Sequence, residues 1–338
     1  MDDPIATIVI TTRDRPDVMA RALASALAQT LSAVEVLIVD DGSCEPLRLE
    51  ATNERVRVVR LAESQGVSAA RNEAIRRAKG TWLTFLDDDD ELLPTMLENS
   101  IETALRSPLP QPVSALSGVE VVDASGRVVE ERMPVIGLPR GGNYFFEDAD
   151  EGDFGVPRTL VAPREVLIAI GGWDPTIRSW EDSDFGLRLN KVCSLVGVRA
   201  VGYRVHLHAT PHLRGDSLEA ARGIERTLRK HRATFGRYRR RHAHYLGAMG
   251  VEYLKAGRWG RAVAGTSRAV VRDPRQGRLW LWWAAALAGP RALRFRRRLR
   301  RRLTHSAPAE VPLSAAAAGS PDLDGRQGVE RIATEHQR

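Results

Sequence analysis

The chain alternates between short apolar runs of strand length and longer segments in which apolar residues recur at helical spacing. The first run, residues 6–10, is rich in β-branched residues and predicts a strand. In residues 16–29 the period changes, because Met19, Ala22 and Leu23 share one helical face and Pro16 suits a helix start. The front of the chain therefore predicts strands separated by amphipathic helices.

The same alternation continues along the chain. Further strands are predicted at 34–39, 56–59 and 81–86, and further helices at 67–79 and 92–106. This order implies an α/β fold with a largely parallel sheet, right-handed crossovers and helices on both faces. In such sheets ligands bind beyond the carboxyl ends of the strands, so loops 11–15, 40–43 and 87–90 should converge on one crevice.

Later elements are less regular. They are predicted as strands within 113–135, a helix near 163–170, a helix over 181–192, a strand over 196–205, and two or three short helices within 244–290. From residue 304 onward Ala, Pro, Gly and Ser dominate, which predicts disorder. We therefore expect an α/β domain over 1–215, a basic helical extension over 216–303 and a disordered tail over 304–338.

Charge is divided unevenly along the chain. Residues 1–215 carry 23 Lys and Arg against 33 Asp and Glu, whereas residues 216–338 carry 27 Lys and Arg against 10 Asp and Glu. The net charge of the whole chain is +7. Such a basic back half favours an anionic partner. The cluster Arg291–Arg302 follows Trp280, Trp282 and Trp283, a pattern typical of an anionic membrane surface. A packed helical hairpin with a solvated basic end explains it equally well, and without a base-reading motif no nucleic acid is expected.

Cysteine content and apolar run lengths indicate the compartment. Cys44 and Cys193 are far apart and form no disulfide framework, which favours a reducing compartment. The N-terminus lacks the basic and apolar segments of a signal peptide, and the apolar run 279–289 is too short to span a bilayer. We expect a cytoplasmic protein that can bind the inner face of the membrane peripherally.

Four consecutive carboxylates, Asp87-Asp88-Asp89-Asp90, directly follow a predicted buried strand. Like charges at a strand end repel and raise one another's pKa unless a cation or hydrogen-bond donors offset them. Divalent metals prefer carboxylate and phosphate oxygens. The run predicts a metal–diphosphate site, with a solvated acidic turn as the alternative.

Two other strand-end motifs suit a nucleotide. Asp40-Asp41-Gly42-Ser43 could accept hydrogen bonds from a base or ribose, although Asp and Gly also make plain turns. The stretch Gly66–Asn72 opens a predicted helix, whose N-terminus favours anions, and Arg71 lies one turn in. Read alone, Arg71 is better explained as a surface arginine.

Two motifs in the second half complete the set. Trp180-Glu181-Asp182 opens a predicted helix, where a carboxylate near aromatic rings suits a general base or, more plainly, an N-cap. His206 and His208 end a predicted strand on the same side, and either could complete a metal site. Strand-end histidines are common, and His212 is a third, weaker candidate.

The order of these motifs resembles the family-2 glycosyltransferases of the GT-A fold over about residues 5–215. The matching segments are 7–16, Val39-Asp40-Asp41-Gly42-Ser43, 66–72, Gly80, 85–90, Gly171-Gly172-Trp173-Asp174, Trp180-Glu181-Asp182 and 203–206. The stretch Arg13-Asp14-Arg15 departs from the Tyr-Asn-Arg-like stretch of many members.

The resemblance implies a metal-dependent, inverting transfer of a sugar from a nucleoside-diphosphate sugar, most often of UDP or dTDP, to an acceptor hydroxyl in polysaccharide, glycolipid or natural-product biosynthesis. The implied roles are nucleotide binding for Thr11, Arg13, Asp40, Arg71, Asp87 and Asp88, Mn²⁺ or Mg²⁺ binding for Asp89 and His206, catalysis by Asp182 with Glu181 beside it, and acceptor-side contacts for Asp90, Trp173 and Trp180.

Two other functions compete with this one. A nucleotidyltransferase also places carboxylates and a metal on a nucleotide, but it should carry a Gly-rich loop with a lysine near the first strand, and residues 11–15 hold neither. A non-catalytic protein that binds anionic surfaces is the second alternative, and the intact set of Asp87, Asp89, Asp182 and His206 disfavours it. The sugar, the acceptor and the oligomeric state are left open by the sequence.

Overall fold

The computed structural model describes residues 3–49, 53–134, 137–142, 158–207 and 216–289. Its strands are β1 (Ala6–Thr12), β2 (Val34–Asp40), β3 (Val56–Arg60), β4 (Trp82–Asp87), β5 (Glu91–Leu92), β6 (Val113–Val122), β7 (Val128–Arg132), β8 (Gly137–Leu138), β9 (Leu160–Pro163) and β10 (Ser194–His206). Its helices are α1 (Pro16–Leu27), α2 (Val67–Arg77), α3 (Met96–Arg106), α5 (Arg164–Ala169), α6 (Glu181–Val192), α7 (Ser217–Lys230), α8 (Arg232–Arg237), α9 (Arg239–Lys255) and α10 (Trp259–Arg272), and residues 277–289 are also helical.

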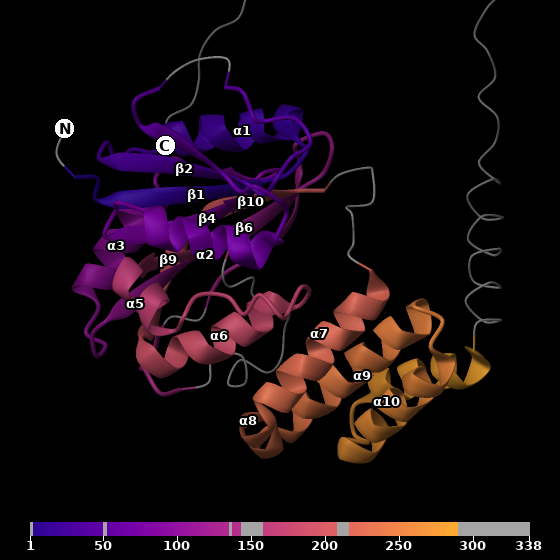
Figure 1. Cartoon of the computed structure of the whole chain (residues 1–338). Helices are drawn as coiled ribbons and strands as arrows, with labels where there is room; N and C mark the ends of the chain where they lie inside the picture. The colour runs from indigo at the N-terminus through magenta and orange to yellow at the C-terminus, as the bar shows by residue number, and fades with distance from the viewer. Residues whose placement is uncertain (1–2, 50–52, 135–136, 143–157, 208–215, 290–338) are drawn as a thin grey trace, which may run out of the picture. The chain divides into compact units, whose positions relative to one another are not determined.

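The described strands form one mixed sheet with helices on both sides (Figure 1). The order is β3-β2-β1-β4-β9-β6-β10-β5, with β7 paired to β6 and β8 to β10. Strands β3, β2, β1 and β4 are parallel, and so are β6 and β10. The predicted α/β class and the strand and helix alternation of the front half are confirmed.

The two faces of the sheet have separate cores, because successive strand residues point to opposite sides. Ile8, Ile10 and Ile38 belong to the core that includes residues of α1 and α3. Val9 and Leu37 belong to the other, with residues of α2, α5 and α6. A sheet buried on both faces explains why its central strands are apolar throughout.

Strand β9 was not predicted, and it lies in the middle of the sheet. It runs antiparallel to both β4 and β6 and joins the two parallel parts. Its four residues are too few to show a strand period, and only the tertiary pairing identifies them.

The helical extension packs against the rest of the chain as part of one core. Ile224, Phe235 and Leu279 belong to the same buried cluster as the α2 face of the sheet. Helices α9 and α10 approach closely at Gly250, where an added Cβ would lie 2.9 Å from the backbone nitrogen of Thr266. The described residues before 290 form one compact unit, and the predicted boundaries at residues 215 and 303 lie outside the described residues.

None of the helices that the structure describes is both long enough and apolar enough to cross a bilayer. The predicted membrane cluster Arg291–Arg302 and the predicted tail over 304–338 lie outside the described residues.

Candidate active site

A cleft opens where the parallel strands end. Thr11 pairs in register with Asp87, and Thr12 with Asp40, so the loops after β1, β2 and β4 meet there. The cleft has a volume of about 530 Å³. Among its lining residues are Thr11, Arg13, Arg15, Asp41, Asp87, Asp88, Asp89, Asp90 and Arg158. The three predicted loops therefore converge on one crevice.

Asp87, the last residue of β4, is held between two arginines. Its Oδ1 accepts from Arg71 Nη2 at 3.0 Å, and its Oδ2 lies 3.0 Å from Arg158 Nε. Burial alone would raise the pKa of Asp87, but Arg158 and Arg71 outweigh it and lower that pKa. Asp87 is thus an ionised carboxylate fixed at the cleft floor.

Asp88 and Asp89 share a third arginine. Arg15 Nη1 donates to Asp88 at 2.7 Å, and Arg15 Nη2 donates to Asp89 at 2.8 Å. Thr12 Oγ1 also donates to Asp88, at 2.8 Å. Burial raises the pKa of Asp88 to about 6 despite these donors. The loop after β1 therefore supplies the counter-charge for the end of β4.

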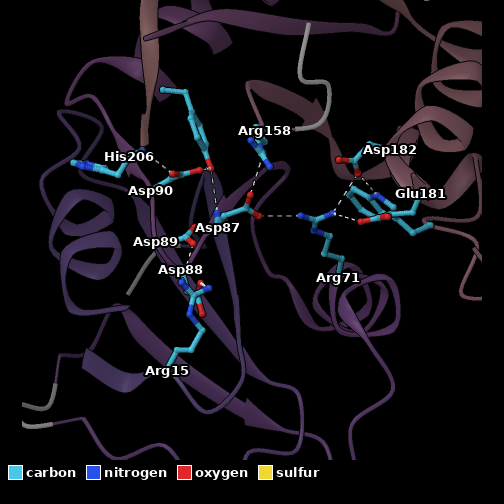
Figure 2. A network of polar contacts seen from close by, with 12 residues as sticks. Arg15, Arg71, Asp87, Asp88, Asp89, Asp90, Arg158, Glu181, Asp182 and His206 are labelled. Carbon is cyan, nitrogen blue, oxygen red and sulfur yellow. Dashed lines mark hydrogen bonds and ion pairs between the residues drawn. The ribbon is translucent and has the colours of Figure 1, made fainter. Parts of the chain in front are cut away.

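Asp90 is nearly buried and points away from these arginines (Figure 2). Tyr203 Oη donates to its Oδ2 at 3.0 Å, and the backbone nitrogen of His206 donates to its Oδ1 at 3.2 Å. Burial, together with the charge of Asp87, raises the pKa of Asp90 to about 7. The cluster thus holds more negative charge than its donors offset.

The imidazole of His206 lies beside this cluster but contacts a different carboxylate. Its Nε2 is 3.0 Å from Glu91 Oε1, while its backbone holds Asp90. His208 and His212 lie outside the described residues. The described contacts of His206 are thus with Asp90 and Glu91 and not with the predicted metal ligand Asp89. Its metal role stays a prediction.

Glu181 and Asp182 occupy the first turn of α6. Trp180 precedes them at φ 64° and ψ 22°, a left-handed conformation that is unusual for a bulky side chain. Asp182 Oδ1 accepts from Arg71 Nη1 and from Trp173 Nε1, both at 3.3 Å. Burial raises the pKa of Asp182, and burial with the charge of Asp182 raises the pKa of Glu181 to about 7.

Arg71 joins the two acidic motifs. Its side chain is nearly buried, and its guanidinium reaches Asp87 on one side and Asp182 on the other (Figure 2). Its charge also lies over the Trp173 ring, 5.2 Å from the ring centroid. A single cation thus bridges Asp87, predicted to bind the nucleotide, and Asp182, predicted to be the catalytic carboxylate.

The two predicted acceptor-side tryptophans lie in different environments. Trp173 is 1% exposed, with its ring stacked on Phe185 at a centroid distance of 4.1 Å. In this structure it presents no open face to a sugar and instead orients Asp182 through Nε1. Trp180 is partly exposed and packs edge-on against Tyr245, with ring centroids 5.7 Å apart.

The two carboxylates of the acidic turn after β2 have different surroundings. Asp40 is fully buried and accepts from the backbone nitrogen of Ser43 at 2.8 Å. Asp41 lines the cleft and accepts from Ser64 Oγ and from the backbone nitrogen of Gln65, both at 2.8 Å. Asp40 therefore stabilises the turn, and its predicted base contact is untested.

Sequence reasoning missed Arg158, gave Arg15 no role of its own, and named Asp41 only as a member of the turn motif after β2. Arg158 comes two residues before β9 and carries no motif, so only the unpredicted strand brings it to Asp87. Arg15 and Asp41 lie within loops that were predicted to form the crevice. Because the acidic run needs positive charge nearby, Arg15 in the neighbouring loop could have been predicted as its partner. Arg13 was predicted for the pocket, and its Nη1 donates to Ser64 Oγ at 2.9 Å.

The donor chemistry of the cleft fits a hard divalent cation. Its lining includes the carboxyl groups of Asp41 and of Asp87 to Asp90 against the guanidinium groups of Arg13, Arg15 and Arg158, so negative charge is in excess there, whereas Arg71, Glu181 and Asp182 are not among the lining residues. No group of three His, Cys, Asp or Glu side chains among the described residues converges tightly enough to hold a metal alone. The site suits a cation that also takes phosphate oxygens from a substrate.

Comparison with known proteins identifies the family of this chain. The family model described as glycosyl transferase family 2 matches residues 7–117. The succinoglycan biosynthesis protein ExoO of Rhizobium meliloti (strain 1021) is 30% identical over 346 residues, which cover 94% of each chain. The Escherichia coli glucosyltransferase WfgD, named for UDP-Glc and an α-D-GlcNAc-diphosphoundecaprenol acceptor, is 30% identical over 110 residues, or 32% of this chain and 44% of WfgD.

A solved structure supports the fold. Staphylococcus aureus TarS 1-349, solved in complex with UDP-GlcNAc, matches 79% of this chain and 81% of that chain with a TM-score of 0.55 at 15% identity. At that identity the likeness shows the fold alone. Together with the full-length match to ExoO and the family model, it means that the chain belongs to glycosyl transferase family 2 and is a glycosyltransferase of the GT-A fold.

Proposed function

We propose that this glycosyltransferase moves a sugar from a nucleoside-diphosphate sugar to an acceptor hydroxyl with inversion, and that Asp182 is the base. The observation that carries the proposal is the Arg71 bridge, 3.0 Å from Asp87 and 3.3 Å from Asp182. The bridge joins a carboxylate predicted to bind the nucleotide to the carboxylate predicted to act in catalysis.

The donor pocket would lie over the ends of β1, β2 and β4. Thr11, Arg13 and Asp41 line that side of the cleft, and helix α2 begins beside it at Val67. Helix N-termini favour phosphates through free N–H groups and the helix dipole. WfgD is named for UDP-Glc and TarS was solved with UDP-GlcNAc, which supports UDP as the donor nucleotide, with dTDP second.

Asp89 would hold Mn²⁺ or Mg²⁺ against the donor diphosphate, with His206 as a further candidate ligand. When bound, the cation would stabilise the charge of the leaving nucleoside diphosphate. In the described structure Asp89 is bonded to Arg15. That guanidinium therefore holds the carboxylate in place and would have to give up this contact as a cation binds.

The chemical step is one displacement at the anomeric carbon. The acceptor oxygen forms the new bond, its proton passes to Asp182, and the bond to the diphosphate breaks from the opposite face. Burial already raises the pKa of Asp182, which makes its carboxylate a stronger base. Arg71 and Trp173 hold that carboxylate in one orientation.

The acceptor class follows from the relatives by analogy. ExoO is named for succinoglycan biosynthesis and matches nearly the whole chain, and WfgD acts on a lipid-linked diphosphate sugar. We therefore favour an acceptor in polysaccharide or glycolipid assembly, used on the inner face of the membrane. No observation in the cleft favours a nucleotidyltransferase, and family membership argues against a non-catalytic role.

Donor hydrolysis tests the proposal without an acceptor. UDP-, dTDP- and GDP-sugars are incubated with the enzyme and Mn²⁺, and the first-formed sugar anomer is followed by ¹H NMR. We expect turnover of UDP-sugars and release of the inverted anomer. First release of the retained anomer would contradict a single displacement, and no turnover of any donor would contradict the donor class.

A further inference from the structure

A second cavity lies in the helical extension, away from the strand ends that form the cleft. It has a volume of about 640 Å³, and residues of α9 and α10 line it. Its walls include Arg239, His242, Arg268 and Arg272 with the apolar Leu246 and Val271. Nothing in the proposed transfer reaction uses these residues.

The extension around this cavity has little negative charge. Residues 217–289 contain sixteen Lys and Arg against four Asp and Glu. Of these four acids, Asp273 pairs with a residue of the cavity wall, because its Oδ1 is 3.9 Å from Arg239 Nε. Arg268 makes no ion pair with any residue that the structure describes. The cavity is therefore a cationic surface in which Asp273 offsets Arg239 while Arg268 has no paired acid.

Two nitrogen atoms of residues in the cavity wall are buried without a hydrogen-bond partner. Within the described part of the chain, His242 Nδ1 and Arg272 Nε have no hydrogen-bond partner. Burial lowers the pKa of His242, and the charges of Arg272 and Arg268 lower it further, so the local potential is positive. Unsatisfied buried donors are costly, and an anion with several oxygens would satisfy them.

One side of the cavity is apolar and open. Val271 is 82% exposed, and Ser267, which also lines the cavity, accepts from Trp283 Nε1 at 3.0 Å. Trp280, 44% exposed, packs edge-on against Trp283 with ring centroids 5.7 Å apart. An exposed aliphatic side chain and tryptophans beside arginines suit a ligand with both charge and apolar surface.

We propose that this cavity binds a phosphate group, with Arg268 and Arg272 as its charged donors and the Nδ1-protonated imidazole of His242 as a third. The phosphate can come from the headgroup of an anionic lipid or from a soluble phosphate. The two sources share the same recognition chemistry and differ in whether the apolar rim is also used. The inference does not depend on the transfer reaction.

Two binding arms on the full chain distinguish the sources. The first titrates inorganic phosphate and follows the His242 imidazole by NMR. The second measures co-sedimentation with vesicles of phosphatidylcholine, with and without phosphatidylglycerol. Arg268→Gln removes one charged donor and should weaken phosphate binding about tenfold. The matched control is Arg229→Gln on α7, because Arg229 is also exposed and lies outside the cavity.

Several outcomes support the site. The site would be established by a phosphate-dependent rise in the His242 pKa that needs about tenfold more phosphate in Arg268→Gln and is unchanged in Arg229→Gln. Vesicle binding that falls only with Arg268→Gln would assign a lipid source, and a response to phosphate alone would assign a soluble one. The inference is overturned if the two variants weaken binding equally, or if His242 does not respond and vesicle binding is unchanged by Arg268→Gln.

Discussion

Arg71 shows how much a single side chain contributes to this site. It is nearly buried, yet it contacts carboxylates from the end of β4 and from the start of α6. Two partly buried acids near one another would repel and destabilise the fold without it. The same bridge means that a bound diphosphate, which attracts guanidinium groups, would alter the surroundings of Asp182.

At the residue scale, replacing Asp182 with Asn should stop transfer while leaving nucleotide binding nearly intact. The amide keeps the shape and can still contact Arg71 and Trp173 through its oxygen, but it cannot accept the acceptor proton. We expect kcat to fall by about 10²–10⁴-fold, with the UDP dissociation constant from calorimetry nearly unchanged.

A matched control for this variant is Asp174→Asn, because Asp174 caps its own turn and pairs with Lys230 outside the cleft. Its kcat should stay close to that of the wild type. Unchanged turnover of Asp182→Asn would refute the assignment of the base.

At the scale of elements, side chains of the helical extension hold helix α6, which carries the proposed base Asp182, in place. Asp184, in the first turn of α6, is fully buried and accepts from His231 Nε2 at 2.8 Å, while Lys230 Nζ lies 2.9 Å away. Tyr245 of α9 donates to Ser183 at 2.9 Å. The extension is therefore a structural support for Glu181 and Asp182 and not a separate appendage.

The contacts of Asp184 with His231 and Lys230 predict that the free energy of unfolding depends on pH. Burial would raise the pKa of Asp184, but hydrogen bonds from His231 and Lys230 and the charge of Arg188 lower it well below its usual range. A lowered carboxyl pKa stabilises the fold above the unfolded-state pKa, about 4 for Asp, and this contribution is lost as pH falls toward the folded-state value.

Asp184→Asn should therefore lower the free energy of unfolding by about 3 kcal/mol at pH 7, and by less as the pH falls below about 4. Urea unfolding at several pH values measures the difference. The exposed pair partner Glu102 provides the control, since Glu102→Gln should change stability by less than about 1 kcal/mol. A difference in unfolding free energy between Asp184→Asn and the wild type that stays constant down to pH 3 would contradict this role of Asp184.

At the scale of the whole molecule, the charge is arranged in two regions of opposite sign. The carboxylates gather at the strand ends, and the arginines gather on the helices after residue 216. The first region predicts a requirement for a cation, because the acidic cluster and a diphosphate would otherwise repel.

Chelation by EDTA should therefore abolish donor turnover, and added Mn²⁺ or Mg²⁺ should restore it. Asp89→Asn should raise the metal concentration needed for half-maximal activity, because one candidate ligand is lost. Circular dichroism in EDTA serves as the control and should show an intact fold. Full activity in chelator would remove the cation from the proposed reaction.

Strand β9 and the roles of the two acids in the turn after β2 could not be predicted from the sequence. The long apolar runs and the glycine and proline punctuation predicted most helices and strands to within a few residues, because those signals are local. Strand β9 has four residues and pairs with strands distant in sequence, so no local pattern identified it. In the β2 turn, the pattern could not tell which of Asp40 and Asp41 faces the cleft.

The sequence by itself determined the α/β alternation, the acidic strand end and the positions of the candidate base and nucleotide loops, since each is a short run of neighbouring residues. Only the tertiary structure decided which charges meet. Arg71 and Asp182 are 111 positions apart, and Arg15 and Asp89 are 74 apart. Such contacts depend on how strands and helices pack, because side chains on separate elements approach only when both elements are in place.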